Sequence, residues 1–212
     1  MIKVRVSRYD PEVDQAPHTE TYEVPAEEKG TVLGALLHIY EHADPTLAFR
    51  SGCRFLRCGL CAVEVNNSPR VACITRLREG MTIKPLHNVN TVRDLVADRS
   101  WIMDEMRRWQ MWVPDARVPQ VFAPPEMLKL AECTECMSCT STCPSWRQGM
   151  ETAGGPLHFV KLAQLHHDPR DATDRRAQAR ALGIARCADC LKCRCVLGIP
   201  IVEMAIRPLL GG

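Results

Sequence analysis

Twelve cysteines, gathered in three groups of four, constrain this chain of 212 residues more than any other feature of its sequence. In chain order the groups are Cys53, Cys58, Cys61 and Cys73, then Cys133, Cys136, Cys139 and Cys143, then Cys187, Cys190, Cys193 and Cys195. The first residues, "MIKVRVSRYD", alternate apolar and charged side chains and lack the apolar core of a secretory signal. Because a reducing compartment keeps thiols free, the pattern favours metal binding over a disulfide framework.

The first group follows the spacing C-x4-C-x2-C, and its fourth cysteine comes after eleven intervening residues, in "SGCRFLRCGLCAVEVNNSPRVAC". This is the plant-type spacing for a 2Fe–2S cluster, in which each iron takes two thiolates. Gly52 and Gly59 suit such a loop, because glycine allows backbone close to the sulfurs and positive φ angles. We therefore expect a 2Fe–2S cluster on Cys53, Cys58, Cys61 and Cys73.

The residues around the first group indicate a β-grasp fold. Four stretches, "IKVRV", "TYEV", "CAVEVN" and "MTIKPL", have the composition of short strands. Thr31 is placed to cap a helix over "VLGALLHIYEHAD". The expected apolar face of this helix consists of Val32, Leu33, Leu36, Leu37 and Tyr40. Strands around one helix predict a plant-type ferredoxin domain over residues 1–98.

The second group has the bacterial ferredoxin spacing C-x2-C-x2-C-x3-C-P, in "CTECMSCTSTCPS". In two-cluster ferredoxins the fourth cysteine of this run binds the other cluster, so the run predicts further ligands downstream. The third group supplies them.

The second half of the chain has helical signals. "PPEMLKLAE" begins with prolines, Pro156 stands at an expected first helical position, and "DATDRRAQARALG" begins with an Asp cap and ends at Gly183. A last helix, "PIVEMAIR", is expected to open on Pro200 and stop at Pro208. We therefore predict an α+β chain, with the β-grasp domain followed by an all-α ferredoxin domain over residues 99–212 that holds two further clusters.

With these motifs the sequence resembles a known family, the iron–sulfur subunits of succinate dehydrogenase and fumarate reductase. The resemblance rests on "SGCRFLRCGLCAVEVN", "PRVACIT", "NTVRDLVAD" and "CTECMSCTSTCPS" and covers nearly the whole chain. It implies an oxidoreductase subunit that relays electrons between an FAD flavoprotein subunit and a quinone at a membrane anchor. It also implies a peripheral position on the cytoplasmic side of the cytoplasmic membrane, with dicarboxylate chemistry on the flavoprotein and no catalytic residue here.

The third group departs from the family spacing C-x5-C-x3-C-P, because "CADCLKCRCVLG" reads C-x2-C-x2-C-x-C. We expect the additional thiol, Cys190, to join Cys143, Cys187 and Cys193 around a second 4Fe–4S cluster. The alternative is a 3Fe–4S cluster with Cys190 as a bystander. Cys195 then completes the first 4Fe–4S cluster, whose expected ligands are Cys133, Cys136, Cys139 and Cys195.

The quinone-binding pattern of the family is incomplete in this chain. Family members carry a His after the first cysteine of the third group, where this chain has Ala188, and an aromatic run after C-P-S, of which "CPSWRQG" keeps only Trp146. The resemblance leaves Pro144, Ser145 and Trp146 as the expected border of a quinone. The seven histidines form no repeating ligand pattern, so we expect them to serve surface or packing roles.

Two other functions stay open from the sequence. The same relay would also serve a related flavoprotein complex with a soluble electron donor or acceptor, and C-x2-C pairs also occur in zinc-binding interaction modules. Nucleic acid is not an expected partner, because 27 basic residues are interspersed with 25 acidic ones and the net charge is +2. No uncharged apolar run of about 18 residues is present, so we expect no membrane span in this chain.

Overall fold

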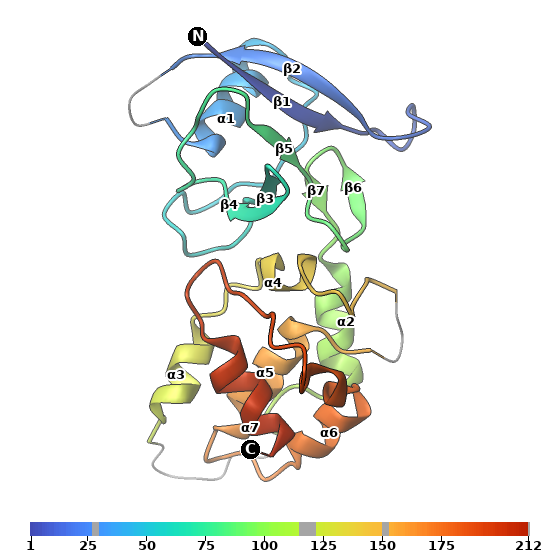
Figure 1. Ribbon diagram of the computed structural model, residues 1–212, viewed down its shortest axis with the longest axis vertical. Coiled ribbons are helices and arrows are strands. Elements are labelled where there is room, and N and C mark those ends of the chain that lie inside the picture. Colours follow the sequence, from blue (N-terminus) through green and yellow to red (C-terminus); the bar gives the residue numbers. More distant parts are fainter. Residues whose placement is uncertain (27–29, 115–121, 150–152, 212) are drawn as a thin grey trace. The chain divides into compact units, whose positions relative to one another are not determined.

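The computed structural model describes residues 1–26, 30–114, 122–149 and 153–211. The chain forms two compact units (Figure 1). The first contains Met1–Asp98 and Cys136–Ser141, and the second contains Arg99–Glu135 and Thr142–Gly212. The described residues include both strands and helices. The short segment Cys136–Ser141 belongs to the first unit although it lies beyond residue 98.

A five-stranded sheet forms the framework of the first unit. Its strands are β1 (Ile2–Arg8), β2 (His18–Val24), β3 (Ala62–Val65), β4 (Ser68–Val71) and β5 (Thr82–Lys84), in the spatial order β2-β1-β5-β3-β4. β1 runs antiparallel to β2 and parallel to β5, and β3 runs antiparallel to both β4 and β5. A separate pair consists of β6 (Thr91–Arg93) and β7 (Val96–Ala97). All four strands expected from the sequence are present, and β4, β6 and β7 are additional.

Helix α1 (Val32–His42) begins where the sequence predicts. The Thr31 hydroxyl accepts a 3.1 Å hydrogen bond from the Gly34 amide, which satisfies one of the free donors at the helix start. Of the expected apolar face, Val32, Leu33 and Leu36 are buried, Leu37 is half-buried, and Tyr40 is wrong. Tyr40 is 47% exposed, whereas Ile39 is fully buried. Ala35 and Ile39 are buried although the expected face omitted both, so the buried face of the helix is rotated relative to the expected one.

A buried arginine joins the two ends of the first unit. The Arg8 side chain is 9% exposed, and its Nε donates to Asp94 Oδ1 at 3.0 Å. Asp94, which is 2% exposed, also accepts hydrogen bonds from the amides of Tyr9 and Ala48. Burial opposes the charge on Arg8, but its hydrogen bonds to Asp94 and Tyr22 outweigh this effect and raise the pKa. The pair fixes the segment before β7 against the end of β1.

The regular secondary structure among the described residues of the second unit is entirely helical, with loops between the helices. Its elements are α2 (Ser100–Arg108), α3 (Pro125–Ala131), α5 (Pro156–His166), α6 (Arg175–Ala181), the 3₁₀ turn η1 (Ile184–Cys187), the π-helical turn η2 (Val202–Ile206) and α7 (Arg207–Leu210). The remaining short helix, α4 (Ser138–Ser141), belongs to the first unit. α5 is central, since it packs against α3, α6, η2 and α7. Its buried side chains include Phe159 and Leu162.

The predicted helix starts are present, but the predicted final stop is wrong. Asp174 caps α6 by accepting from the Ala177 amide at 2.9 Å, and Pro156 occupies the first turn of α5. The last helix continues through Pro208 to Leu210. Proline cannot donate to the carbonyl four residues before it, which is that of Met204. The wider turn of η2 precedes the proline, and the His167 ring nitrogen lies 3.3 Å from the Met204 carbonyl oxygen and takes the place of the missing donor.

No helix among the described residues is long and apolar enough to cross a membrane.

Candidate iron–sulfur sites

The loop that carries Cys53 and Cys58 directs backbone amides at sulfur atoms. The Arg57 and Cys58 amides lie 3.1 Å and 3.3 Å from Cys53 Sγ, and the Cys53 amide lies 3.5 Å from Cys58 Sγ. Amide donors favour a charged sulfur over a neutral one. A hydrogen bond from the Phe55 amide makes the largest contribution and, with the others, lowers the pKa of Cys53 to about 7. This environment suits a thiolate ligand.

The backbone of the same loop adopts conformations that most side chains avoid. Arg54 and Leu56 have φ angles of 61° and 67°, and Gly59 has 66°. Residues with positive φ that alternate with residues of ordinary backbone conformation turn successive amides toward one side of the loop. Such amides form a concave site for a negatively charged group. A Cβ atom at Gly52 would lie 3.1 Å from Cys58 Sγ and 3.2 Å from Leu60 Cδ1. The expected close approach at Gly52 and positive φ at Gly59 are therefore both present.

Cys61 and Cys73 lie deeper in the first unit. They are 4% and 9% exposed, and the Ala72 amide donates to the Cys61 carbonyl at 2.9 Å, which joins their two segments. Burial raises the pKa of Cys61 to about 11, and the neighbouring Cys73 and Cys58 thiols add to this shift. The four thiols thus form a continuous set in one unit, with Cys53 beside Cys58, Cys58 beside Cys61 and Cys61 beside Cys73. The donors and the loop conformation fit a 2Fe–2S cluster.

A second set of four thiols lies within the second unit. Burial raises the pKa of Cys187 to about 11 and that of Cys193 to about 12. Cys193 interacts electrostatically with Cys187, Cys143 and Cys190, and Cys187 interacts with Cys143 and Cys190. Cys190 therefore lies within electrostatic range of the other three thiols. Because iron binds thiolates, iron binding at Cys187 and Cys193 would release the protons that burial holds on these two thiols.

Arg186 is a neighbour of this set that the sequence reasoning missed. Its guanidinium lowers the pKa of Cys187, against the larger effect of burial, and also acts on Cys143. Nη2 donates to the Leu182 carbonyl at 3.2 Å and to the Gly154 carbonyl, so the positive charge is held in place. An arginine next to a cysteine in the sequence is common, so neither Arg186 itself nor the cysteine spacing indicated that its charge would lie beside these thiols.

The remaining ligand candidates are divided between the units. Cys136 and Cys139 belong to the first unit, and Cys133 and Cys195 to the second. Cys195 Sγ accepts from the Leu197 amide at 3.3 Å. Positive φ angles recur in these loops, at Glu135 and Met137 in the second group and at Leu191 in the third. Lys161 of α5 lies 2.6 Å from the Glu135 carboxylate and fixes that residue. The grouping of these four thiols on one cluster stays a prediction.

The residues after Cys143 differ sharply in exposure. Pro144 is exposed and Ser145 half-buried, but Trp146 is only 3% exposed. Its ring lies 4.9 Å from that of Trp101 and 6.4 Å from that of His158. Trp146 is thus a packed part of the second unit, and the quinone border at Pro144, Ser145 and Trp146 stays a prediction.

His158 orders this aromatic group. Its Nδ1 accepts from the Gly155 amide at 3.1 Å, so Nε2 carries the proton and donates to Glu105 Oε2 at 3.3 Å. This hydrogen bond is the main reason why the pKa of Glu105 is lowered. His158 agrees with the expectation that the histidines serve surface or packing roles.

All twelve cysteines are free of disulfide bonds. Among the residues that the structure describes, no three or more His, Cys, Asp or Glu side chains are gathered closely enough to hold a single metal ion.

Comparisons with known proteins place these sites in a family. Residues 3–104 match the family described as "2Fe-2S iron-sulfur cluster binding domain". A fumarate reductase (CoM/CoB) subunit of Methanothermobacter marburgensis is 38% identical over 197 residues, which are 91% of this chain and 40% of that protein. The chain thus spans about two fifths of the length of this relative.

Other relatives are closer to this chain in length. The fumarate reductase iron–sulfur subunit of Haemophilus influenzae is 31% identical over 193 residues, covering 81% of this chain and 75% of that protein. Among solved structures, a chain of the Mycobacterium smegmatis Sdh1 complex in the apo form matches with a TM-score of 0.78 and 27% identity, over 98% of this chain and 93% of that one. The chain therefore belongs to the family of iron–sulfur subunits of fumarate reductase and succinate dehydrogenase.

Proposed function

We propose that this chain is the electron-transfer subunit of a fumarate reductase or succinate dehydrogenase complex. It relays electrons between an FAD flavoprotein subunit and a quinone at a membrane anchor, on the cytoplasmic side of the cytoplasmic membrane. The observation that carries the proposal is the loop of residues 53–61, whose amides point at cysteine sulfurs in a chain of this family. Substrate chemistry belongs to the flavoprotein, and the clusters here supply single-electron steps.

The proposal assigns each part of the chain a task. Residues 1–98 are the β-grasp domain with the 2Fe–2S cluster, and residues 99–212 are the helical ferredoxin domain with the two other clusters. The first 4Fe–4S cluster takes Cys133, Cys136, Cys139 and Cys195. The second takes Cys143, Cys187, Cys190 and Cys193, an assignment supported by the interaction of Cys190 with each of the other three thiols. Pro144, Ser145 and Trp146 are the proposed quinone border.

The test is EPR spectroscopy of the anaerobically purified protein, oxidised and reduced, together with iron and sulfide analysis. About ten irons per chain and no three-iron signal are expected from one 2Fe–2S and two 4Fe–4S clusters. About nine irons with a three-iron signal in the oxidised protein would return Cys190 to the role of bystander. A colourless protein that binds zinc and no iron would overturn the proposal as a whole.

A second candidate is the same relay with a soluble electron donor or acceptor in place of quinone. It is favoured by the similarity to the Methanothermobacter marburgensis fumarate reductase subunit whose name carries CoM/CoB. Fractionation of the native complex separates the two candidates. Recovery from detergent-solubilised membranes with an anchor subunit supports the quinone relay, whereas recovery from the soluble fraction with the flavoprotein alone supports the second candidate.

A further inference from the structure

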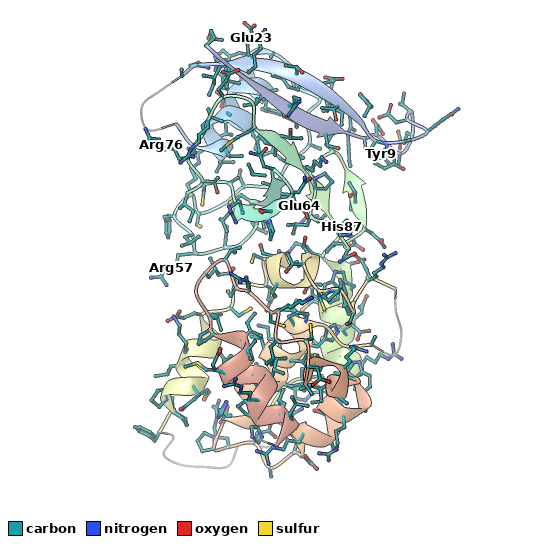
Figure 2. The ribbon with its side chains drawn as sticks, in the orientation of Figure 1. Tyr9, Glu23, Arg57, Glu64, Arg76 and His87 are labelled. Carbon is teal, nitrogen blue, oxygen red and sulfur yellow. The ribbon has the colours of Figure 1, made fainter. Side chains whose placement is uncertain are left out.

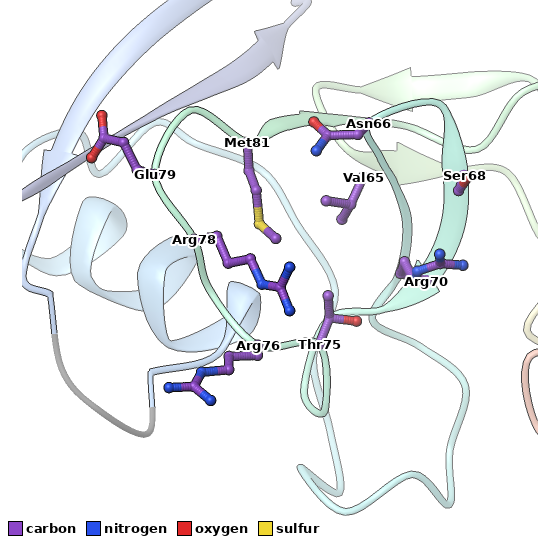
Figure 3. Close-up of a pocket in the computed structure, with 9 residues that line it drawn as sticks. All are labelled: Val65, Asn66, Ser68, Arg70, Thr75, Arg76, Arg78, Glu79 and Met81. Atoms are coloured by element: carbon purple, nitrogen blue, oxygen red, sulfur yellow. The ribbon is translucent and has the colours of Figure 1, made fainter.

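A cavity of about 400 Å³ opens on the first unit beside the turn that carries Cys73. Strand β4, at the edge of the sheet, supplies one wall, and residues 75–81 supply the other (Figure 3). Its floor includes Val65 and Met81, which are 5% and 8% exposed. A volume toward the low end of the range for ligand pockets, about 300–1,000 Å³, suits a small molecule.

Three arginines line this cavity: Arg70, Arg76 and Arg78. In Figure 3 the Arg78 guanidinium extends into the space between Thr75 and Met81, whereas the guanidinium groups of Arg70 and Arg76 lie at the rim and point away from that space. Among the described residues, no carboxylate forms an ion pair with any of the three. Arg70 donates to the carbonyl of Pro69 at 3.0 Å.

The one acidic side chain in the lining is engaged elsewhere. The Glu79 carboxylate accepts a 3.0 Å hydrogen bond from the Lys3 amide, and Figure 3 shows it directed away from Arg78. Arginine presents a planar set of donors that matches carboxylate and phosphate oxygens in pairs. Positive charge at the rim, arginine donors without a carboxylate partner in the described part of the chain, and an apolar floor together select an anion with a short carbon skeleton.

We propose that this cavity binds a small organic polyanion, with a carboxylate or phosphate group on Arg78 inside the cavity, further positive charge from Arg70 and Arg76 at the rim, and its carbon skeleton on Val65 and Met81. The site is separate from the cysteine ligands and does not depend on the proposed electron relay.

One lining residue of the cavity, Thr75, belongs to the turn that carries Cys73. The Thr75 amide and hydroxyl both donate to the Val71 carbonyl, at 3.1 Å and 2.8 Å, and this turn encloses Cys73. An anion held beside Thr75 adds negative charge near the first set of thiols. On the proposed function, it lowers the reduction potential of the 2Fe–2S cluster, and the oxidised protein in turn binds the anion more tightly, since such coupling is reciprocal.

The first experiment is isothermal titration calorimetry of the full, cluster-containing chain at fixed ionic strength. Citrate and pyrophosphate are the probes, and sodium chloride at matched ionic strength is the reference. One saturable site is expected for at least one probe, and the preferred probe distinguishes carboxylate from phosphate chemistry. Arg78→Gln weakens binding by about tenfold or more, because each lost charge-assisted contact contributes about 1.5–3 kcal/mol.

Matched variants decide between a defined site and general charge attraction. Arg107→Gln removes the same charge from an exposed helix position whose pair with Asp104 is 71% exposed on both sides, and it leaves binding unchanged. Charge reversal in Arg78→Glu abolishes binding. Absence of saturable binding to either probe, or equal weakening in Arg78→Gln and Arg107→Gln, would overturn the proposed site. Binding without a change in the 2Fe–2S potential would retain the site and overturn the coupling.

Discussion

The backbone amide of Arg57 lies 3.1 Å from the sulfur of Cys53, and Figure 2 labels Arg57 on this loop of the first unit. The side chain of Arg57 is exposed, so its contribution to the site comes from the backbone. Amides that point at a ligand sulfur stabilise added negative charge and so adjust the reduction potential of a cluster. The conformation of the loop therefore contributes to function independently of the identity of its side chains.

Gly52→Ala is expected to impair the 2Fe–2S site. The new Cβ atom would lie 3.1 Å from Cys58 Sγ, so that sulfur must move by a few tenths of an ångström. Iron content and the visible circular dichroism of the first cluster are the measurements, and both should fall. Gly34→Ala is the control, since its Cβ atom would meet only Thr31 Oγ1 at 3.5 Å. Equal cluster content in the two variants would contradict the prediction.

Cys190→Ser is expected to convert the second 4Fe–4S cluster, proposed on Cys143, Cys187, Cys190 and Cys193 and called the distal cluster below, from four irons to three. Iron analysis should fall from about ten to about nine per chain, with a three-iron EPR signal in the oxidised protein. The matched control is Asp189→Ser, an exposed neighbour on the same turn. An unchanged iron count in Cys190→Ser would show that this thiol is not a ligand.

Arg186→Gln is expected to lower the potential of the distal cluster, on the order of tens of millivolts, because it removes a positive charge beside Cys187 and Cys143. Redox titration followed by EPR measures this change. Arg186→Lys keeps the charge and should retain most of the potential. A similar drop in both variants would indicate that the hydrogen bonds to Gly154 and Leu182 matter more than the charge.

Arg8→Met is expected to destabilise the first unit by about 3–5 kcal/mol, because it leaves Asp94 buried without its charge partner. Hydrogen exchange of the β1 and β2 amides measures this loss. Lys3→Met on the same strand is the control, since its pair with Glu23 is more than half exposed on both sides and contributes about 0–1 kcal/mol. A loss below about 1 kcal/mol in Arg8→Met would contradict a stabilising role for the pair.

Asp44 gives the first unit a defined pH dependence. Burial disfavours its charge, but hydrogen bonds from Thr46, Tyr22 and Arg8 outweigh burial and lower the pKa from 3.8 to about 2. A lowered carboxyl pKa stabilises the fold above the unfolded value, and this stability is lost as the pH falls through the folded value. The stability difference between the native chain and Asp44→Asn should be constant from pH 7 to pH 5. It should shrink between about pH 4 and pH 2, as measured by unfolding at each pH, and a difference that persists at pH 2 would contradict this assignment.

Local signals predicted much of this fold. The Thr31 and Asp174 caps and the start of α5 at Pro156 depend on residues within one helical turn, and all three are present. The positions that sequence did not predict depend on distant partners. Ile39 rather than Tyr40 is buried because parts of the chain distant in sequence pack on that face of α1. The last helix continues past Pro208, where His167 lies beside the carbonyl of Met204.

In the candidate sites, too, the features set by local sequence were predicted and those that depend on distant residues were not. Cysteine spacing in the sequence identified the groups, because cluster ligands within one loop are close in the chain. The position of Arg186 beside Cys143, 43 residues earlier in the chain, required the folded structure. So did the membership of Cys136–Ser141 in the first unit, where Ser141 Oγ lies 3.2 Å from the Glu64 carboxylate and the His87 amide donates to the same oxygen (Figure 2 labels Glu64 and His87).

The positive φ angles of the cysteine loops have a consequence for biogenesis. Arg54, Leu56, Glu135, Met137 and Leu191 each hold a backbone conformation that costs an ordinary residue about 1–2 kcal/mol, and every cysteine group contains at least one of them. In a newly made chain without iron, these loop conformations lack the stabilisation that cluster binding would supply to offset their strain. On the proposed function, delivery of each cluster is then also the last step of folding for its loop, and we expect chains made without iron or sulfide to have loops that are open to proteases.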